Sequence, residues 1–244
     1  MRSATQTRGA LALANAHRIP DAGGSIASSG GFAGRYDRSM PESAIEVVLF
    51  DLGGVLFDFG GVEPMKSLSG IEHDDEIWRR WLGCRWVRTF ERGSCSAEQF
   101  AEGVVGDWAL PITPDAFLHS FRSWLGGPFA GADVLVREAR NKVKVGCLSN
   151  TNTLHWTDQA NRWELLNAFD FRFLSFQMGY VKPDREIFDR TAQLLDRPRD
   201  RVLFLDDNAI NVEGARAAGF QAMRAVGVDD ARRCLMAVGL LPEG

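Results

Sequence analysis

The stretch Ala44-Ile-Glu-Val-Val-Leu-Phe-Asp-Leu-Gly-Gly-Val55 decides how this chain folds. Its apolar run through Phe50 predicts a buried strand, and Asp51 ends that strand. In open α/β sheets, ligands bind outside the carboxyl ends of the strands, where we expect Asp51. The glycines at 53 and 54 let backbone N–H groups approach an anion closely. We therefore expect Asp51 either to attack a ligand or to hold a metal ion.

Length and composition are those of an ordinary globular protein. The 244 residues are 45% hydrophobic and 25% charged, which suits one large domain or a domain with an insert. The net charge of -4 argues against general nucleic-acid binding, because nucleic-acid-binding proteins carry basic surfaces. No apolar run reaches the roughly 20 residues that a membrane helix needs. We expect neither nucleic acid nor a membrane as a partner, and either a monomer or a homodimer.

The four cysteines are scattered without a Cys-x-x-Cys pair, and the four histidines lack the spacing of metal ligands. Cysteines arranged in this way are typical of reduced thiols rather than of disulfides or a zinc site. We therefore expect a cytoplasmic protein with free thiols.

Residues 1–43 differ in composition from the rest of the chain. They are rich in Ala, Ser, Gly and Arg, and the stretch at 25–34 has too few large apolar residues to form a core. This composition also describes an organelle transit peptide, although three acidic residues and the lack of an amphipathic stripe weaken that interpretation. We expect a disordered tail, or an extension ahead of a working start at Met40.

Beyond this segment, strand and helix patterns alternate. After the first strand, helical periodicity runs from about 62 to 127, and Leu125-Gly-Gly-Pro128 has the composition of a hinge. Later strands are expected at 143–148, 171–176, 201–205 and 221–225. Because helices separate these strands, the order predicts an α/β fold with a doubly wound, Rossmann-like parallel sheet. We expect a core at 44–61 and 128–244, and a helical cap at 62–127.

Local patterns mark two helix starts in the cap. Ser96-x-x-Gln99 has the pattern of a capping box, and Thr113-Pro114 that of an N-cap followed by proline. Five tryptophans fall between residues 78 and 124, and their helical spacing predicts core packing rather than a sugar-binding platform.

Ser149 and Asn150 follow the strand expected at 143–148, and Asp206 and Asp207 follow the strand expected at 201–205. Lys182 opens the helix before the second of these strands. Because the carboxyl ends of parallel strands face one crevice, we expect these residues to meet Asp51. Grouped carboxylates repel one another unless a cation joins them, and hard oxygen ligands suit Mg²⁺. Hydroxyl, amide, ammonium and backbone N–H groups suit a phosphate.

Four segments together resemble the motifs of the haloacid dehalogenase-like hydrolase superfamily. In order, they are Phe50-Asp-Leu-Gly-Gly-Val55, Leu148-Ser-Asn-Thr151, Val181-Lys-Pro-Asp184 and Phe204-Leu-Asp-Asp-Asn208. The helical insert resembles the C1-type cap of that superfamily, and the resemblance covers about residues 45–228. The first motif and the segment at 90–100 are similar to bacterial phosphatases of the α-D-glucose-1-phosphate phosphatase type. This resemblance implies a Mg²⁺-dependent phosphatase for a small phosphorylated metabolite, with sugar phosphates as one option.

The resemblance also implies a role for each motif residue. Asp51 would be the nucleophile that forms an aspartyl-phosphate, while Ser149 and Lys182 would hold the phosphoryl oxygens. The metal ligands would be Asp51, the carbonyl of Gly53, Asp207 and, directly or through water, Asp206. Further phosphate contacts would come from Asn150 and the backbone N–H groups of Leu52 and Gly53.

Gly53 departs from the family pattern. Most phosphatases of this superfamily have an Asp here that protonates the leaving oxygen, and losing a general acid typically costs ~10²–10⁴-fold in rate. Water or a nearby group such as Asp58 could replace it, or the substrates could have leaving groups that need little protonation. A weak enzyme or a non-catalytic binding protein is the third explanation. We favour the second, with the anomeric oxygen of a sugar 1-phosphate as an example.

One turn in the cap region carries charged residues that could reach a substrate. The turn Glu91-Arg92-Gly93-Ser94 is our candidate for a specificity loop that reaches toward Asp51, with Arg92 as a substrate-binding residue. The alternative enzyme is a 2-haloacid dehalogenase, in which Asp51 would attack carbon. The Asp206/Asp207 pair argues against it, because that reaction has no use for a cation site.

Overall fold

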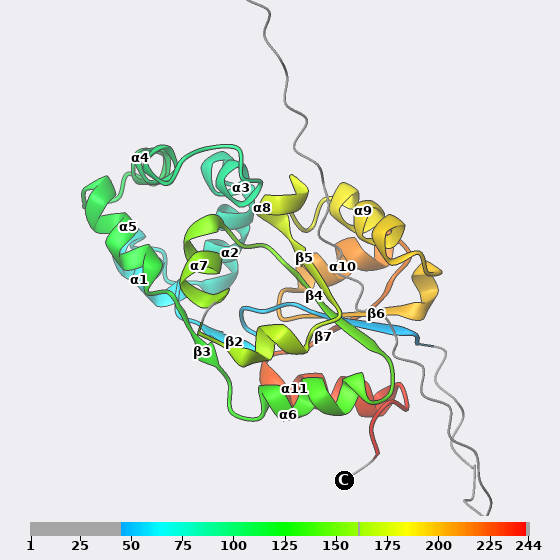
Figure 1. Cartoon of the computed structure of the whole chain (residues 1–244). Helices are drawn as coiled ribbons and strands as arrows, with labels where there is room; N and C mark the ends of the chain where they lie inside the picture. Colours follow the sequence, from blue (N-terminus) through cyan, green and yellow to red (C-terminus); the bar gives the residue numbers. More distant parts are fainter. Residues whose placement is uncertain (1–44, 161, 243–244) are drawn as a thin grey trace, which may run out of the picture. The chain divides into compact units, whose positions relative to one another are not determined.

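A computed structural model describes residues 45–160 and 162–242 of the chain. The tail expected at 1–43, and the proposed start at Met40, lie outside the described residues. A five-stranded sheet forms the centre of the described part, and helices flank it (Figure 1). Among the described helices, none is both long and apolar enough to cross a membrane.

The sheet is parallel throughout, with strand order β5-β4-β1-β6-β7. The strands are β1 (Val47–Phe50), β4 (Lys144–Ser149), β5 (Phe171–Leu174), β6 (Val202–Asp206) and β7 (Gln221–Arg224). Strand β1 is central, because Val47 pairs with Lys144 on one side and with Val202 on the other. The chain therefore fills the sheet in opposite directions from β1, which confirms the predicted doubly wound fold.

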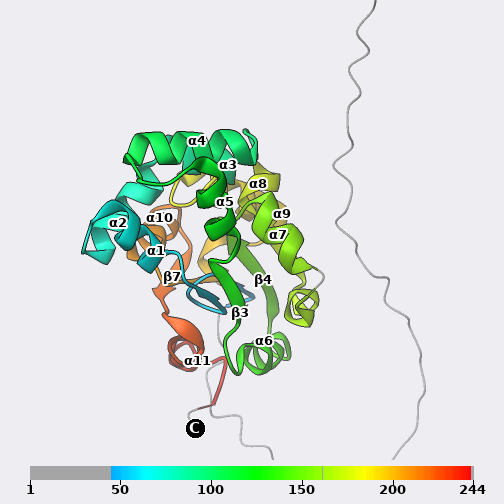
Figure 2. The same ribbon diagram turned by 90° about the vertical axis from the view of Figure 1, so that its left-hand side faces the viewer.

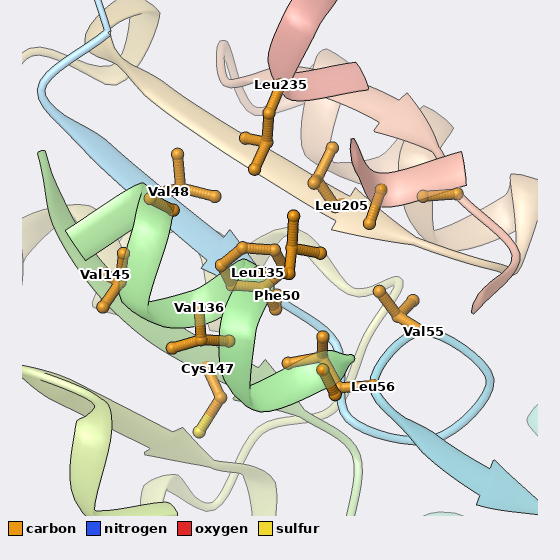
Figure 3. Packing of buried hydrophobic residues seen from close by; sticks show 14 of the residues in the cluster. Val48, Phe50, Val55, Leu56, Leu135, Val136, Val145, Cys147, Leu205 and Leu235 are labelled. Atoms are coloured by element: carbon orange, nitrogen blue, oxygen red, sulfur yellow. The ribbon is translucent and has the colours of Figure 1, made fainter. Parts of the chain in front are cut away.

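One face of the sheet packs on two helices. Helix α6 (Ala132–Arg140) and helix α11 (Gly227–Ala237) lie beside each other on this face (Figures 1 and 2). Val48 and Phe50 of β1 point into this core and are fully buried. Figure 3 shows Leu135 of α6 among these side chains.

The opposite face packs on helices α9 (Arg185–Leu195) and α10 (Ala209–Ala217). Val47 and Leu49 of β1 point toward this second core, since successive side chains of a strand alternate between faces. Both faces of β1 are therefore covered. This explains why its sequence is continuously apolar rather than alternating.

The helical cap is inserted between two short strands that pair with each other. Strands β2 (Phe57–Phe59) and β3 (Leu125–Pro128) form an antiparallel ribbon. The cap helices are α1 (Val62–Ser69), α2 (Asp74–Gly83), α3 (Arg85–Glu91), α4 (Ala97–Trp108) and α5 (Pro114–Arg122). The segment expected to be a hinge, 125–128, is thus strand β3. Backbone pairing with β2 joins the two ends of the insert.

Aromatic side chains form the core of the cap. Trp81 lies 6.2 Å from Phe121 in a stacked arrangement, and Phe90 stacks on Phe100 at 4.4 Å between ring centroids. Trp81, Trp108 and Trp124 are buried in this cluster, as their spacing predicts. Core packing therefore accounts for these three tryptophans, and the other two of the five, Trp78 and Trp86, are partly buried against the same cluster.

The two predicted helix starts are confirmed. Ser96 Oγ accepts a hydrogen bond from the Gln99 N–H at 3.3 Å, and Gln99 Oε1 accepts one from the Ser96 N–H at 3.1 Å. Thr113 Oγ1 accepts from the Ala116 N–H at 3.2 Å. Each N-cap side chain accepts a hydrogen bond from a backbone N–H that has no partner within the first helical turn.

The remaining elements are short. They are helices α7 (Thr153–Ala160) and α8 (Ser175–Met178), and 3-10 turns η1 (Glu164–Ala168) and η2 (Arg199–Arg201). The strand expected at 171–176 ends at Leu174, and helix α8 begins at the next residue. Ser175 is fully buried there, and its hydroxyl bonds both the N–H and the carbonyl of Thr151 at 2.9 Å.

Leu135→Ala should lower the free energy of unfolding by about 2–5 kcal/mol, because it opens a cavity against the central sheet. Val134→Ala is the matched control, since Val134 precedes it on helix α6 and is 43% exposed. Urea unfolding of both variants checks this expectation. Equal losses of stability in the two variants would contradict the described packing of α6.

Candidate active site

The carboxyl ends of three neighbouring strands bring the predicted residues together. Asp51 follows β1, Ser149 ends β4 and Asp206 ends β6. All three residues are buried, at 9%, 3% and 0% exposure respectively. They lie at the edge where the strand order reverses around β1, the usual place for a ligand in such sheets.

Lys182 joins two of these strand ends through its buried ammonium group. Its side chain is 1% exposed, and Nζ lies 2.9 Å from Asp51 Oδ1 and 2.6 Å from Asp206 Oδ2. Burial opposes the charge, but the carboxylates of Asp206 and Asp51 more than offset it and hold the pKa of Lys182 above its ordinary value. Lys182 is therefore a fixed positive charge beside Asp51.

Asn150 fixes the backbone of Lys182. The Lys182 N–H donates to Asn150 Oδ1 at 2.8 Å, and Asn150 Nδ2 donates to the Lys182 carbonyl at 3.0 Å. This two-point contact ties the end of β4 to the loop before α9. Asn150 also lines the pocket described below, so it can both position Lys182 and face a ligand.

The two adjacent aspartates have different surroundings. Asp206 Oδ1 accepts hydrogen bonds from the Asn208 N–H at 2.9 Å and Asn211 Nδ2 at 3.1 Å, while Oδ2 accepts from Asn211 and Lys182. By contrast, none of the described side chains donates a hydrogen bond to the Asp207 carboxylate. Asp206 is therefore held in place, and Asp207 is the carboxylate with capacity for a further ligand.

The oxygen atoms of three carboxylates gather at one point. One oxygen each of Asp51, Asp206 and Asp207 lies within 4.8 Å of the others. Burial, followed by repulsion from Asp206, raises the pKa of Asp207 to about 7. Burial also raises the pKa of Asp51 to about 6, although Lys182 opposes this rise. This set of crowded hard oxygen donors fits Mg²⁺, which would relieve the repulsion.

The backbone of the first motif passes close to this cluster. Gly54 has a φ of 76°, and a Cβ there would lie 2.5 Å from the carboxyl carbon of Asp207. Only glycine allows that approach. Gly53 is different, because the atoms nearest to a Cβ at this position belong to Phe59, and the shortest contact would be an ordinary 3.5 Å. Packing therefore does not explain why residue 53 lacks a side chain.

A pocket between the cap and the sheet opens onto Asp51. Its core side includes Asp51, Gly53, Ser149, Asn150, Lys182 and Asp207. Its cap side is formed by Trp78, Trp81, Leu82, Glu91 and Phe121. The pocket holds about 110 Å³, against roughly 300–1,000 Å³ for sites that bind drug-sized ligands. It therefore suits a small ligand.

The turn at 91–94 reaches the site with a different residue from the one we expected. Glu91 lines the pocket, whereas Arg92 does not. Arg92 Nη2 instead donates to Asp184 Oδ2 at 2.6 Å. The sequence indicated the turn, but Glu91 and Arg92 are both long charged residues. The way helix α3 ends determines which of the two faces the core.

Two other pocket residues were not identified from the sequence. His155 Nε2 lies 2.8 Å from the carbonyl oxygen of Phe121, and Nδ1 lies 3.3 Å from Asn152 Nδ2. Burial lowers the pKa of His155, so it is a neutral side chain whose nitrogens both have partners. Asn211, the other residue, orients Asp206. No motif in the sequence marks either of them.

Asp207→Asn should remove a pH-dependent loss of stability in EDTA. The folded pKa of Asp207, about 7, exceeds the ordinary 3.8, so its contribution to stability is lost as the pH rises between these values. As the pH rises over this range, the stability of the Asp207→Asn variant should therefore increase relative to that of the wild type. Mg²⁺ should stabilise the wild type by about 2.7 kcal/mol when its concentration is a hundred times Kd. It should stabilise the Asp207→Asn variant less.

Thermal melts with and without Mg²⁺ check this expectation, with Asp200→Asn as the control because Asp200 is an exposed aspartate outside the pocket. Parallel pH curves and equal stabilisation of wild type and Asp207→Asn by Mg²⁺ would contradict a cation site at Asp207.

Comparison with known proteins agrees with this geometry. The family model of the haloacid dehalogenase-like hydrolases matches residues 45–219. A D-ribitol-5-phosphate phosphatase of Bacteroides thetaiotaomicron is 25% identical to the chain, over 74% of this chain and 91% of the relative. An (S)-2-haloacid dehalogenase of Pseudomonas fluorescens is 27% identical, over 72% and 82% respectively.

A solved structure shows the same fold. It is that of a haloacid dehalogenase family enzyme of Bacteroides thetaiotaomicron, in complex with magnesium and inorganic phosphate. It matches with a TM-score of 0.56 at 25% identity, covering 74% of this chain and 93% of that chain. Together with the family match and the predicted motifs, this shows that the chain belongs to the haloacid dehalogenase-like hydrolases.

Proposed function

We propose that this protein is a Mg²⁺-dependent phosphatase that hydrolyses a small phosphorylated metabolite, such as a sugar phosphate, through an aspartyl-phosphate at Asp51. The observation that supports this most is that the Asp51 carboxylate lies 2.9 Å from the ammonium of Lys182 and within 4.8 Å of an oxygen of Asp207, to which none of the described side chains donates a hydrogen bond. An anionic nucleophile can approach an anionic phosphate only where positive charge offsets their repulsion. Lys182 supplies part of that charge, and a cation at Asp207 would supply the rest.

Each group that faces the pocket or the oxygen cluster then has a role in the proposed reaction. At neutral pH the Asp51 carboxylate is ionised, because the pH exceeds its pKa of about 6, and it attacks phosphorus. Lys182 and Ser149 bind the phosphoryl oxygens, with Asn150 and the backbone N–H groups of Leu52 and Gly53 beside them. Mg²⁺, held by Asp51, Asp207 and the Gly53 carbonyl, with Asp206 direct or through water, would neutralise the phosphate charge.

Three further observations support this proposal. The small pocket suits a small substrate. A relative, the D-ribitol-5-phosphate phosphatase, acts on a phosphorylated polyol by its name, and a related structure was solved with magnesium and inorganic phosphate. The four cysteines are free, three of them buried, which supports the proposed cytoplasmic location.

The dehalogenase alternative rests on the haloacid dehalogenase relative. In that reaction the same carboxylate would attack carbon without a metal. The unpaired Asp207, with its pKa raised to about 7, favours the phosphatase, because a carbon-centred displacement leaves this carboxylate without a function.

The wild-type protein should release phosphate from members of a metabolite panel when Mg²⁺ is present, and EDTA should abolish the release. Asp51→Asn should reduce it to the level without enzyme, because an amide is too weak a nucleophile. The exposed control Asp200→Asn should retain activity. Phosphate release that survives Asp51→Asn would overturn the proposal. Chloride release from 2-chloropropionate in EDTA, without phosphate release, would favour the dehalogenase.

A further inference from the structure

Glu91 is a pocket residue to which the proposed reaction assigns no role. The titratable side chains that line the pocket are Asp51, Glu91, His155, Lys182 and Asp207. Asp51 and Lys182 act on the phosphate, and Asp207 belongs to the oxygen cluster. Both nitrogens of His155 already have partners. Of the described titratable residues that line the pocket, only Glu91 is therefore left to exchange a proton with a ligand.

Arginines on both sides of Glu91 fix the end of helix α3 against the core. Arg88 and Arg92 lie one helical turn apart, and both donate to Oδ2 of Asp184. Asp184 is two residues beyond Lys182, so this contact ties the cap to the loop that carries the buried ammonium. Glu91 lies between the two arginines in the chain and faces the pocket on the core side of the cap.

The turn after Glu91 also packs closely against the core. Gly93 has a φ of 69°, and a Cβ there would lie 2.5 Å from the carbonyl oxygen of Phe176 in helix α8. Only glycine allows this contact. On the cap side, the side chain of Trp81 hydrogen-bonds the Glu91 carboxyl group. The position of Glu91 is therefore set by the cap and the core together.

The surroundings of Glu91 favour a neutral carboxylic acid. Burial is the largest effect and raises the pKa of Glu91 to about 8; the negative charge of Asp51 acts in the same direction. The positive charges of Lys182 and Arg88, and the hydrogen bond from Trp81, oppose the rise. At neutral pH Glu91 thus holds a proton near the nucleophile, as a general acid must.

We propose that Glu91 is the proton donor of the reaction. It takes the role of the aspartate that most phosphatases of the superfamily have at the position of Gly53. This inference rests on the proposed phosphatase function. As Asp51 attacks phosphorus, the bond from phosphorus to the leaving oxygen breaks, and Glu91 gives its proton to that oxygen. Water then attacks the aspartyl-phosphate, the bond from phosphorus to Asp51 breaks, and Glu91 accepts a proton from the water. Inorganic phosphate leaves, and both carboxyl groups return to their starting state.

This assignment changes the substrates that we expect. From the sequence, we expected substrates whose leaving groups need little protonation, because Gly53 cannot donate a proton. A donor at Glu91 allows alkyl phosphates as well, whose leaving oxygen must be protonated. Asp58, the other acid considered as a replacement, is exposed on β2 and does not line the pocket.

Glu91→Gln is the first test, because it removes the proton and keeps the size and neutrality of the side chain. For the best alkyl monophosphate of the panel, kcat/KM should fall by ~10²–10⁴-fold. For p-nitrophenyl phosphate, whose leaving group needs little protonation, the fall should be less than about tenfold. Glu102→Gln, the same change at an exposed position of helix α4, should leave both rates unchanged.

A second variant tests whether the defect is one of proton donation. Gly53→Asp places a carboxyl group where most phosphatases of the superfamily have one, and a Cβ fits there. The double variant Glu91→Gln/Gly53→Asp should recover alkyl phosphate hydrolysis by at least about tenfold over Glu91→Gln. Glu91→Gln/Gly53→Asn, which offers no transferable proton, should not recover it.

The wild type provides a measurement that does not depend on the folding of any variant. With a proton donor in place, kcat/KM should vary little across a series of phosphates from aryl to alkyl leaving groups. Equal effects of Glu91→Gln on both substrate classes, or a wild type that hydrolyses only aryl phosphates, would overturn the role of Glu91 alone. If the wild type releases phosphate from no substrate, the proposed function fails, and this inference fails with it.

Discussion

The buried ammonium of Lys182 is the interaction on which the rest of the site depends. It brings the carboxylates of Asp51 and Asp206, from the ends of two neighbouring strands, to within 2.9 and 2.6 Å of one cation. Without that charge, two buried carboxylates would repel each other at the carboxyl edge of the sheet. Removing one partner of a buried ion pair typically costs about 3–5 kcal/mol. Asn150 fixes the Lys182 backbone and so helps to hold the ammonium group beside Asp51 and Asp206.

Charge balance explains why this arrangement favours a divalent cation. When all three are ionised, the carboxylates of Asp51, Asp206 and Asp207 exceed the single charge of Lys182 by two. Burial is the main cause of the raised pKa values of Asp51 and Asp207, and repulsion among the carboxylates adds to it. A divalent cation would balance the excess, and the phosphate of the proposed substrate would then restore negative charge beside Asp51.

The cap closes the site and contributes to its electrostatics. Its wall of Trp78, Trp81 and Phe121 is apolar, so it removes water from the neighbourhood of Asp51 and Lys182. Interactions between charges are stronger in such a site than in water. The same desolvation holds the pKa of Glu91 near 8. The cap therefore affects the chemistry through its environment as well as through the carboxyl group that it contributes.

Much of the core of the site could be predicted from the sequence, because Asp51, Ser149 and Asp206 each end or directly follow a recognisable strand. Asp51, Ser149 and Asp206 meet since parallel strands end at one edge of a sheet. The cap contribution could not be predicted in the same way. Which of Glu91 and Arg92 faces the pocket depends on the contact of Arg88 and Arg92 with Asp184, more than ninety residues away in the chain. Periodicity within helix α3 does not reveal such a contact.

The central claim is that Asp51 accepts the phosphoryl group. Borohydride reduces an acyl phosphate to an alcohol, so quenching the enzyme with borohydride during turnover converts a phosphorylated aspartate to homoserine. Peptide mass spectrometry should then find homoserine at residue 51, only when substrate and Mg²⁺ are both present. An unmodified Asp51 in samples that are releasing phosphate, or homoserine at another aspartate, would contradict this account.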